Sequence, residues 1–144
     1  MYRPIPGLTI EEQPEAIVVC LALWGEARGE SPEGKLGVLY VLHNRAKRRS
    51  KSLKEIALQP LQFSTFNEDD PNRARLLKAD QLDLASWAAC EAIFGIYEAG
   101  WTTDPTLGST HYFAHNIVTP KWGPGHPDWI GKTVIGRHTF GVAA

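Results

Sequence analysis

The feature that most constrains this chain is an apolar helical run that ends at a pair of acidic residues. The run reads Ala-Ile-Val-Val-Cys-Leu-Ala-Leu-Trp over residues 16–24, and Gly-Glu-Ala-Arg-Gly-Glu-Ser-Pro follows it directly. Apolar residues recur at helical spacing, which predicts a helix over about residues 10–28 with Glu26 on its last turn. Glu26 and Glu30 are four residues apart, a spacing that puts two side chains on one face of a helix. A glycine and a proline then end the helix, so the run presents a carboxyl group at a helix terminus, a candidate for catalysis.

The composition is that of an ordinary globular protein. The chain has 144 residues, of which 43% are hydrophobic and 22% charged, enough for one domain with a real core. The formal net charge of -1 gives no global field that would attract nucleic acid, so we expect no nucleic-acid partner. The N-terminus lacks the apolar segment of a secretory signal, and no apolar run is long enough to span a membrane. We therefore expect a monomer that is made in the cytoplasm and has no stable membrane association.

The remaining pattern predicts an α+β fold that is mainly α-helical, a helical bundle with a small C-terminal β-element. Capping residues and helical spacing predict a second helix from Ser31-Pro32 to a basic run at 44–51, short helices at 52–58 and 72–78, and a long, mostly buried helix at 80–99. Residues 110–113 and 133–140 resemble short strands around a long loop. Cys20 and Cys90 fall inside apolar helical patterns and are predicted to be reduced core thiols.

Several short motifs occur along the chain in a shared order. They are Trp-Gly-Glu-Ala-Arg-Gly-Glu at 24–30, Gly34, Asn44-Arg45, Gln62-Phe63-Ser64, Asp104-Pro105-Thr106, Tyr112-Phe113 with Asn116, Trp122, and Ile135-Gly136-x-His138-x-Phe140. Together they resemble the cell wall hydrolase family typified by the spore-cortex-lytic enzymes SleB and CwlJ, over about residues 17–140. The resemblance implies a lysozyme-like fold. Several members of the family have a separate wall-binding domain, whereas we expect this chain to be a single catalytic domain over 1–144 without one. The resemblance also implies cleavage of peptidoglycan between N-acetylmuramic acid and N-acetylglucosamine, by a lytic transglycosylase or a muramidase.

The chemistry of that cleavage favours Glu26 as the catalytic residue. An acid must donate a proton to the leaving oxygen near neutral pH, which requires a carboxyl group held against apolar surface. Hydrolysis needs a second carboxylate, whereas a lytic transglycosylase uses the C6 hydroxyl of muramic acid as nucleophile and needs one glutamate as acid and then base. We predict the one-glutamate mechanism, with Glu30 as a positioning carboxylate or a second catalytic one. Asp104 is expected to cap a turn.

The same motifs supply candidate substrate-binding residues. Aromatic rings pack well on sugar faces, and polar side chains bind acetamido and hydroxyl groups. The predicted set is Trp24, Arg28, Ser64, Tyr112, Asn116, Trp122 and His138. The partner is bacterial peptidoglycan, and no cofactor is expected. A small catalytic module without a signal resembles phage endolysins, so we expect synthesis in the host cytoplasm and action on the cell wall after release through a holin-type membrane lesion.

Two other classes stay open. One is a zinc peptidoglycan amidase, because His111, His115, His126 and His138 lie close in sequence; their spacings fit no helical metal motif, and we expect no metal. The other is a non-enzymatic module that binds the wall or nucleic acid through the basic segment 45–54. That segment is equally explained as a solvated helix end, where cations suit the helix dipole.

Overall fold

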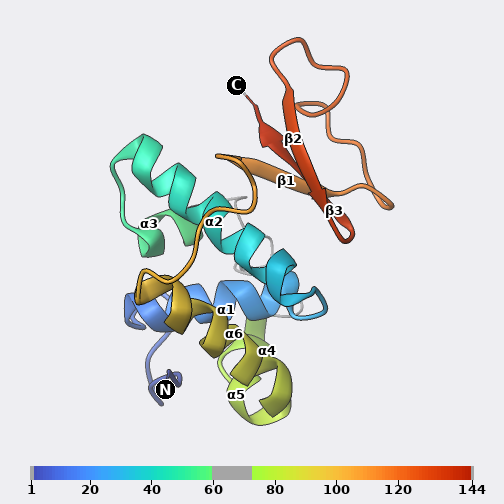
Figure 1. Cartoon of the computed structure of the whole chain (residues 1–144). Helices are drawn as coiled ribbons and strands as arrows, with labels where there is room; N and C mark the ends of the chain where they lie inside the picture. The colour runs from blue at the N-terminus through green and yellow to red at the C-terminus, as the bar shows by residue number, and fades with distance from the viewer. Residues whose placement is uncertain (1, 60–72, 144) are drawn as a thin grey trace.

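The computed structural model describes residues 2–59 and 73–143 (Figure 1). Its elements in chain order are α1 (Glu15–Ala27), α2 (Pro32–Arg49), α3 (Leu53–Ala57), α4 (Arg73–Leu76), α5 (Ala79–Leu82), α6 (Leu84–Glu98), β1 (His111–Ala114), β2 (Ile130–Ile135) and β3 (His138–Val142). The helices pack together on one side and the strands form a small sheet on the other. The predicted α+β, mainly helical, lysozyme-like fold with a C-terminal β-element is confirmed.

Helix α1 is the centre of the helical part. Residues 18–23 are completely buried, and α2, α3 and α6 all contact the helix. A helix that is apolar on every side is stable only when neighbours surround it, which explains this placement. The predicted start at residue 10 was wrong because Pro14 disfavours helical backbone in the residue before it. Thr9 and Glu12 do exchange the expected capping hydrogen bonds, but these close a separate turn ahead of the helix.

Helix α2 begins as its sequence predicts. The Ser31 side chain accepts a hydrogen bond from the backbone N–H of Gly34 at 3.1 Å, and Pro32 occupies the first helical turn. The helix ends at Ser50, whose φ of 54° is left-handed. Helix α3 follows with a complete capping box between Ser52 and Glu55.

The long helix predicted over 80–99 is two helices. Asp83 has non-helical backbone, with φ -143° and ψ 67°, and its side chain caps α6 by accepting from the N–H of Ser86. The prediction that this element is mostly buried was also wrong, since α6 buries one face only, and Leu84 is 61% exposed. The buried face consists of Trp87, Cys90, Ile93 and Phe94. Cys90 and Cys20 both lie in the core as free thiols.

The sheet is antiparallel with strand order β1-β3-β2. Residues 133–140, predicted as one strand, form a hairpin because Ile135 pairs with His138 across a two-residue turn. Gly136 opens that turn with φ 56°, a conformation that glycine adopts without strain. One sheet face packs on α2 through Phe140, for which Gly37 leaves room: a Cβ there would lie 2.8 Å from the Phe140 ring.

Polar contacts fix the segment that leads into β1. Asn44 on α2 donates to the Asp104 carboxylate at 2.9 Å and to the Ser109 carbonyl at 2.8 Å. Asp104 also accepts from the N–H groups of Thr106 and Gly108, so it caps this turn as predicted. Although burial opposes ionisation, these hydrogen bonds lower the pKa of Asp104. The Asn44 and Asp104 motifs therefore position β1.

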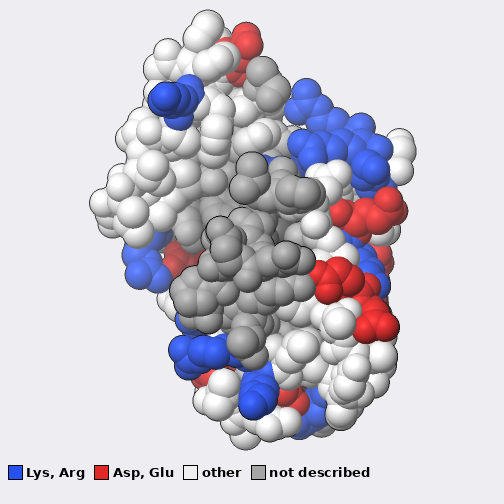
Figure 2. Space-filling model, turned by 180° about the vertical axis from the view of Figure 1, so that it is seen from behind, with Lys and Arg blue, Asp and Glu red and all other residues white. Residues whose placement is uncertain are grey.

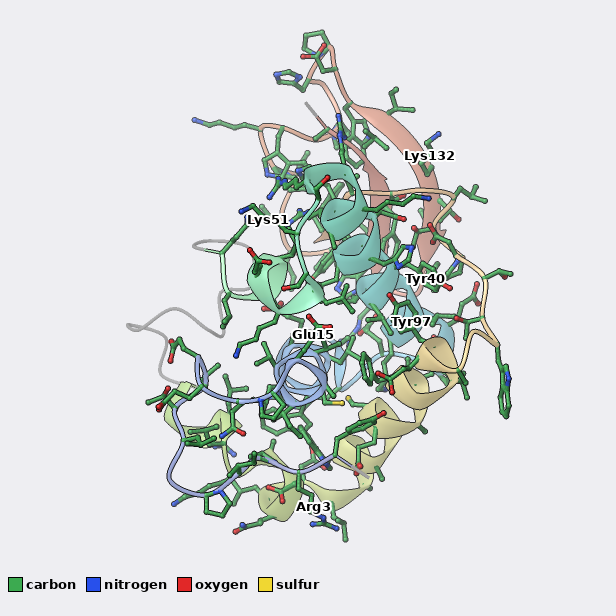
Figure 3. All side chains as sticks on the ribbon, turned by 90° about the vertical axis from the view of Figure 1, so that its left-hand side faces the viewer. Arg3, Glu15, Tyr40, Lys51, Tyr97 and Lys132 are labelled. Carbon is green, nitrogen blue, oxygen red and sulfur yellow. The ribbon has the colours of Figure 1, made fainter. Side chains whose placement is uncertain are left out.

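Helices α2 and α6 also meet through an aromatic contact. The Tyr40 and Tyr97 rings lie 5.5 Å apart, edge to face, between the two helices (Figure 3). His43 and the Tyr97 hydroxyl share a hydrogen bond of 2.7 Å. None of the helices in the described ranges is long and apolar enough to cross a membrane.

Candidate active site

A pocket of about 370 Å³ opens where the end of α1, strand β1 and the β2–β3 hairpin meet. It is lined by residues from both ends of the chain, namely Glu26, Glu30, Tyr112, Ala114, Asn116, Ile117, Arg137 and His138. Both acidic residues that the sequence singled out face this one cavity. Its concave shape and mixed lining are those of a ligand site.

Glu26 enters the pocket from the last turn of α1, where it is half-buried. The Tyr112 hydroxyl, on β1, donates a hydrogen bond to the Glu26 carboxylate at 3.4 Å. Burial and the nearby Glu26 charge raise the pKa of Tyr112 well above its usual value. Tyr112 therefore keeps its proton at neutral pH and stays a donor to Glu26.

Glu30 lies just beyond α1 with its side chain 7% exposed. Arg137, at the tip of the hairpin, contacts it with two guanidinium nitrogens, of which Nε is 3.1 Å from Oε2. The other oxygen lies 3.7 Å from Nδ1 of His138. Burial acts to raise the pKa of Glu30, but the hydrogen bonds and charge of Arg137, together with the nearby His138 ring, outweigh it and lower the pKa. Glu30 is thus held as a carboxylate.

His138 connects the two halves of the pocket. Its ring packs edge to face on Tyr112, with centroids 5.0 Å apart, while Nδ1 points toward Glu30. Burial and the Arg137 charge lower the pKa of His138 although Glu30 acts to raise it. At neutral pH the imidazole is therefore uncharged, and it orients its neighbours through packing and local polarity.

Five of the predicted site residues meet in this pocket: Glu26, Glu30, Tyr112, Asn116 and His138. Ser64 lies outside the described residues. Trp24 and Arg28 are placed elsewhere. The Trp24 ring is only 3% exposed, and the Arg28 guanidinium stacks over it at 4.2 Å while donating to its carbonyl. Trp24 is therefore a core residue, and Arg28 covers its ring, so neither lines this pocket.

Trp122 also lies away from the pocket. Side chains alternate between the faces of a strand, so Phe113 points away from the face on which Tyr112 lies. Trp122 packs with its ring centroid 6.0 Å from Phe113 and 5.8 Å from Trp129. Trp122 therefore belongs to an aromatic cluster on the opposite face of the sheet and does not line this pocket, and its contact with substrate stays a prediction.

Three lining residues were missed, namely Arg137, Ala114 and Ile117. Arg137 follows the glycine of a motif that the sequence did show, and a hairpin tip is a natural place for a reaching side chain. No local spacing pairs it with Glu30, because 107 residues separate them. Ile117 is 84% exposed at the pocket rim, and an isolated apolar residue in a loop does not indicate a binding site in the sequence.

The four histidines considered as zinc ligands have separate surroundings. His111 bonds to the Thr110 hydroxyl, His115 to Thr139, and His126 accepts from the N–H of Asp128. Over residues 2–59 and 73–143, no three His, Cys, Asp or Glu side chains are grouped so that they could hold a metal ion. This arrangement gives the amidase alternative no ligand set within the described ranges.

Comparison with known proteins gives a family and a fold. The sequence model of the family described as Cell Wall Hydrolase matches residues 29–141. Among solved structures, the chain is similar to the catalytic domain of the germination-specific lytic transglycosylase SleB from Bacillus anthracis, with 22% identity, TM-score 0.64, and coverage of 95% of this chain and 98% of that one. It is also similar to the catalytic domain of the Bacillus cereus SleB protein, with 22% identity, TM-score 0.63 and coverage of 98% of both chains. A search of curated proteins finds no match.

A conserved sequence pattern over most of the chain defines a class of enzymes that act on the bacterial cell wall. This chain belongs to the Cell Wall Hydrolase family. The matched range begins at residue 29, so it includes Glu30, Tyr112 and His138, while Glu26 lies just before it. The structural matches extend over nearly the whole chain and share its fold.

Proposed function

We propose that this protein cleaves the glycan strand of peptidoglycan between N-acetylmuramic acid and N-acetylglucosamine as a lytic transglycosylase. The observation that carries the proposal is that the two glutamates of the pocket have different surroundings. Glu30 is committed to Arg137 and His138, whereas Glu26 shares the cavity with a protonated tyrosine. In this proposal Glu26 transfers the proton, and Glu30 stays an anion. The fold that the chain shares with the catalytic domain of a lytic transglycosylase supports this activity.

The reaction uses Glu26 twice. As the bond between C1 of muramic acid and the bridging oxygen breaks, protonated Glu26 gives its proton to that oxygen, which leaves as the hydroxyl of N-acetylglucosamine. The C6 hydroxyl of the same muramic acid then forms a bond to C1, and its proton goes to the Glu26 carboxylate. The product is a 1,6-anhydro sugar, and Glu26 is returned to its starting state.

The neighbours of Glu26 have supporting roles in this scheme. Tyr112 directs one carboxylate oxygen of Glu26 through its hydrogen bond. The negative charge of Glu30 lies in the same cavity, where it stabilises positive charge that develops at C1 in the transition state. Asn116 and Ile117 at the rim would contact the sugar rings.

A second candidate function is hydrolysis by a muramidase. The same ionised Glu30 favours it, because a carboxylate opposite an acid is what activation of water or capture of the sugar requires. The two functions differ in their products, which are anhydro ends for transglycosylation and reducing ends for hydrolysis.

Mass spectrometry of soluble products from purified peptidoglycan tests the proposal. We expect 1,6-anhydro-muropeptides from the wild type, with or without EDTA, and none from Glu26→Gln. Glu33→Gln, an exposed glutamate on the first turn of α2, is the matched control and should act as the wild type does. Reducing muramic acid ends would instead establish the muramidase, and stem peptides cut from intact glycan would establish an amidase.

As biological setting we propose a phage endolysin that reaches the wall after a membrane lesion. Membership of a family of cell wall hydrolases supports a lytic role. Expression in the bacterial cytoplasm with and without a pore-forming protein tests the setting. Lysis that requires both the pore and Glu26 supports it, and lysis without the pore contradicts it.

A further inference from the structure

A second cavity, of about 320 Å³, lies between the C-terminal half of α2 and the start of β1. We refer to it as the cationic pocket. Its lining consists of Arg45, Arg48, Arg49, Thr110, His111 and Ala143. The basic end of α2, at upper left in Figure 1, corresponds to the group of blue atoms at upper right in Figure 2.

Within residues 2–59 and 73–143, no carboxylate pairs with the arginines of the cationic pocket. The ion pairs in this part of the chain are made by Arg3, Lys51 and Arg137, and by none of the three arginines of this pocket. Burial lowers the pKa of Arg45 to about 10, with a further contribution from Arg49, and a guanidinium of this pKa is still charged at neutral pH. Burial and the three arginines likewise lower the pKa of His111 to about 4. Three guanidinium groups around one cavity make a site for an anion, and their planar forks suit a carboxylate.

The cationic pocket and the Glu26 pocket both open along β1. Thr110 and His111 line the cationic pocket, and Tyr112 and Ala114 line the Glu26 pocket. Thr110 and Ala114 are separated by about 13 Å along an extended strand. Arg45 donates a hydrogen bond to the Thr110 carbonyl, which fixes the cationic pocket to this strand.

Two neighbouring pockets along about this length of strand suit the substrate of the proposed function, on which the inference rests. The muramic acid of peptidoglycan carries an acidic peptide stem, and about four extended residues of chain also reach about 13 Å. We infer that the cationic pocket binds carboxylate groups of the peptide stem while the glycan strand occupies the Glu26 pocket. The pocket then selects wall segments whose stems are intact.

Activity on two substrates tests this inference. One is peptidoglycan with its stems and without phosphate-containing wall polymers, and the other is the same glycan stripped of stems by an amidase. In Arg48→Gln/Arg49→Gln, the preference in kcat/KM for stem-bearing over stripped glycan should fall about tenfold, the effect of losing one charge-assisted hydrogen bond. Lys47→Gln/Lys51→Gln removes two charges from the same helix end outside the pocket and should keep the wild-type preference. An unchanged preference in the arginine variant overturns the inference, and an equal loss in the lysine control does the same, because the effect would then be general charge.

Direct binding separates this inference from the proposed activity. A synthetic stem tetrapeptide titrated into Glu26→Gln protein should shift the NMR signals of His111, and Arg48→Gln/Arg49→Gln should abolish the shift. This result is independent of whether glycan is cleaved. Inorganic phosphate is the second probe. If phosphate saturates the His111 shift while the tetrapeptide leaves it unchanged, the pocket is a phosphate site and the stem assignment is wrong.

Discussion

The guanidinium of Arg137 donates a hydrogen bond to the carboxylate of Glu30, with Nε 3.1 Å from Oε2, although the two residues are 107 positions apart in the sequence. Glu30 follows the central helix α1, and Arg137 is at the tip of the β2–β3 hairpin. The pair therefore ties the helical part to the sheet at the wall of the Glu26 pocket. The Glu30 side chain is buried, at 7% exposed, whereas the Arg137 side chain is 65% exposed and reaches it from the solvent side.

The first prediction concerns this pair. Arg137→Gln leaves a buried carboxylate without its main partner, so the pKa of Glu30 should rise and turnover should fall. Because solvent screens the exposed guanidinium, we expect a stability loss of only about 1 kcal/mol. Lys132→Gln, an exposed lysine on the same hairpin (Figure 3), is the control and should change neither quantity. Chemical denaturation and initial rates are the measurements, and equal effects of the two variants would refute the role of the pair.

The second prediction concerns acid. The pKa of Glu30 is lowered in the folded state, so its stabilising contribution is complete above the ordinary value of 4.5 and is lost as pH falls through the lowered pKa. The pKa of His138 is also lowered, so the folded state loses stability as pH falls below 6.5 and unfolded chains take up the proton first. Both groups therefore make the protein less stable in acid.

Thermal unfolding of the wild type and Glu30→Gln between pH 7 and pH 3 measures this effect. Glu30→Gln should have the lower Tm at pH 7, and the difference should shrink below pH 4.5 as the wild-type carboxylate is protonated. Glu33→Gln, which removes an exposed carboxylate, should follow the wild type throughout. A Tm difference that is constant down to pH 3 would mean that the Glu30 charge does not stabilise the fold.

Local sequence predicted the helices, the strands and their capping residues. It predicted structure less well where a contact between residues distant in sequence determines the conformation. Ser31-Pro32 and Ser52 signal their own helix starts through bonds within four residues. The division of the long helix at Asp83 and the start of α1 after Pro14 were also visible in principle, since both residues are known to interrupt or cap helices. The apolar pattern over 133–140 predicts one strand, whereas the positive φ of Gly136 allows the tight turn that makes it a hairpin.

The candidate pocket shows the same limit more sharply. Glu26 and Glu30 were found from spacing, and Tyr112, Asn116 and His138 from family motifs. These residues meet in one pocket because the sheet packs on α2, and no local sequence pattern predicts that packing. An aromatic residue beside an acid looks the same in sequence whether it faces a sugar or the core, and the Trp24 ring is 3% exposed. Arg137 was missed because its partner is 107 residues away.

The third prediction concerns the tyrosine beside Glu26. Tyr112→Phe removes the hydroxyl that donates to the Glu26 carboxylate at 3.4 Å while keeping the ring that packs on His138. We expect kcat to fall about tenfold, the effect of one lost hydrogen bond to a charged group, with little change in KM. Tyr40→Phe is the matched control, because its hydroxyl bonds to Thr102 at 2.9 Å outside the pocket. A normal kcat in Tyr112→Phe would show that the hydrogen bond does not serve catalysis.

The last prediction concerns the seam between helix and sheet. A Cβ at Gly37 would lie 2.8 Å from the Phe140 ring, which is completely buried between α2 and the sheet. Gly37→Ala should destabilise the protein by about 1–3 kcal/mol through overpacking, despite the better helix propensity of alanine. Gly95→Ala in α6 makes the same chemical change where a Cβ meets nothing within 4 Å, and it should stabilise by up to about 1 kcal/mol. Urea denaturation of the two variants should therefore move the midpoint in opposite directions. A shift of the same sign in both would mean that the ring has room to move away, and that the sheet is held on α2 less tightly than this contact implies.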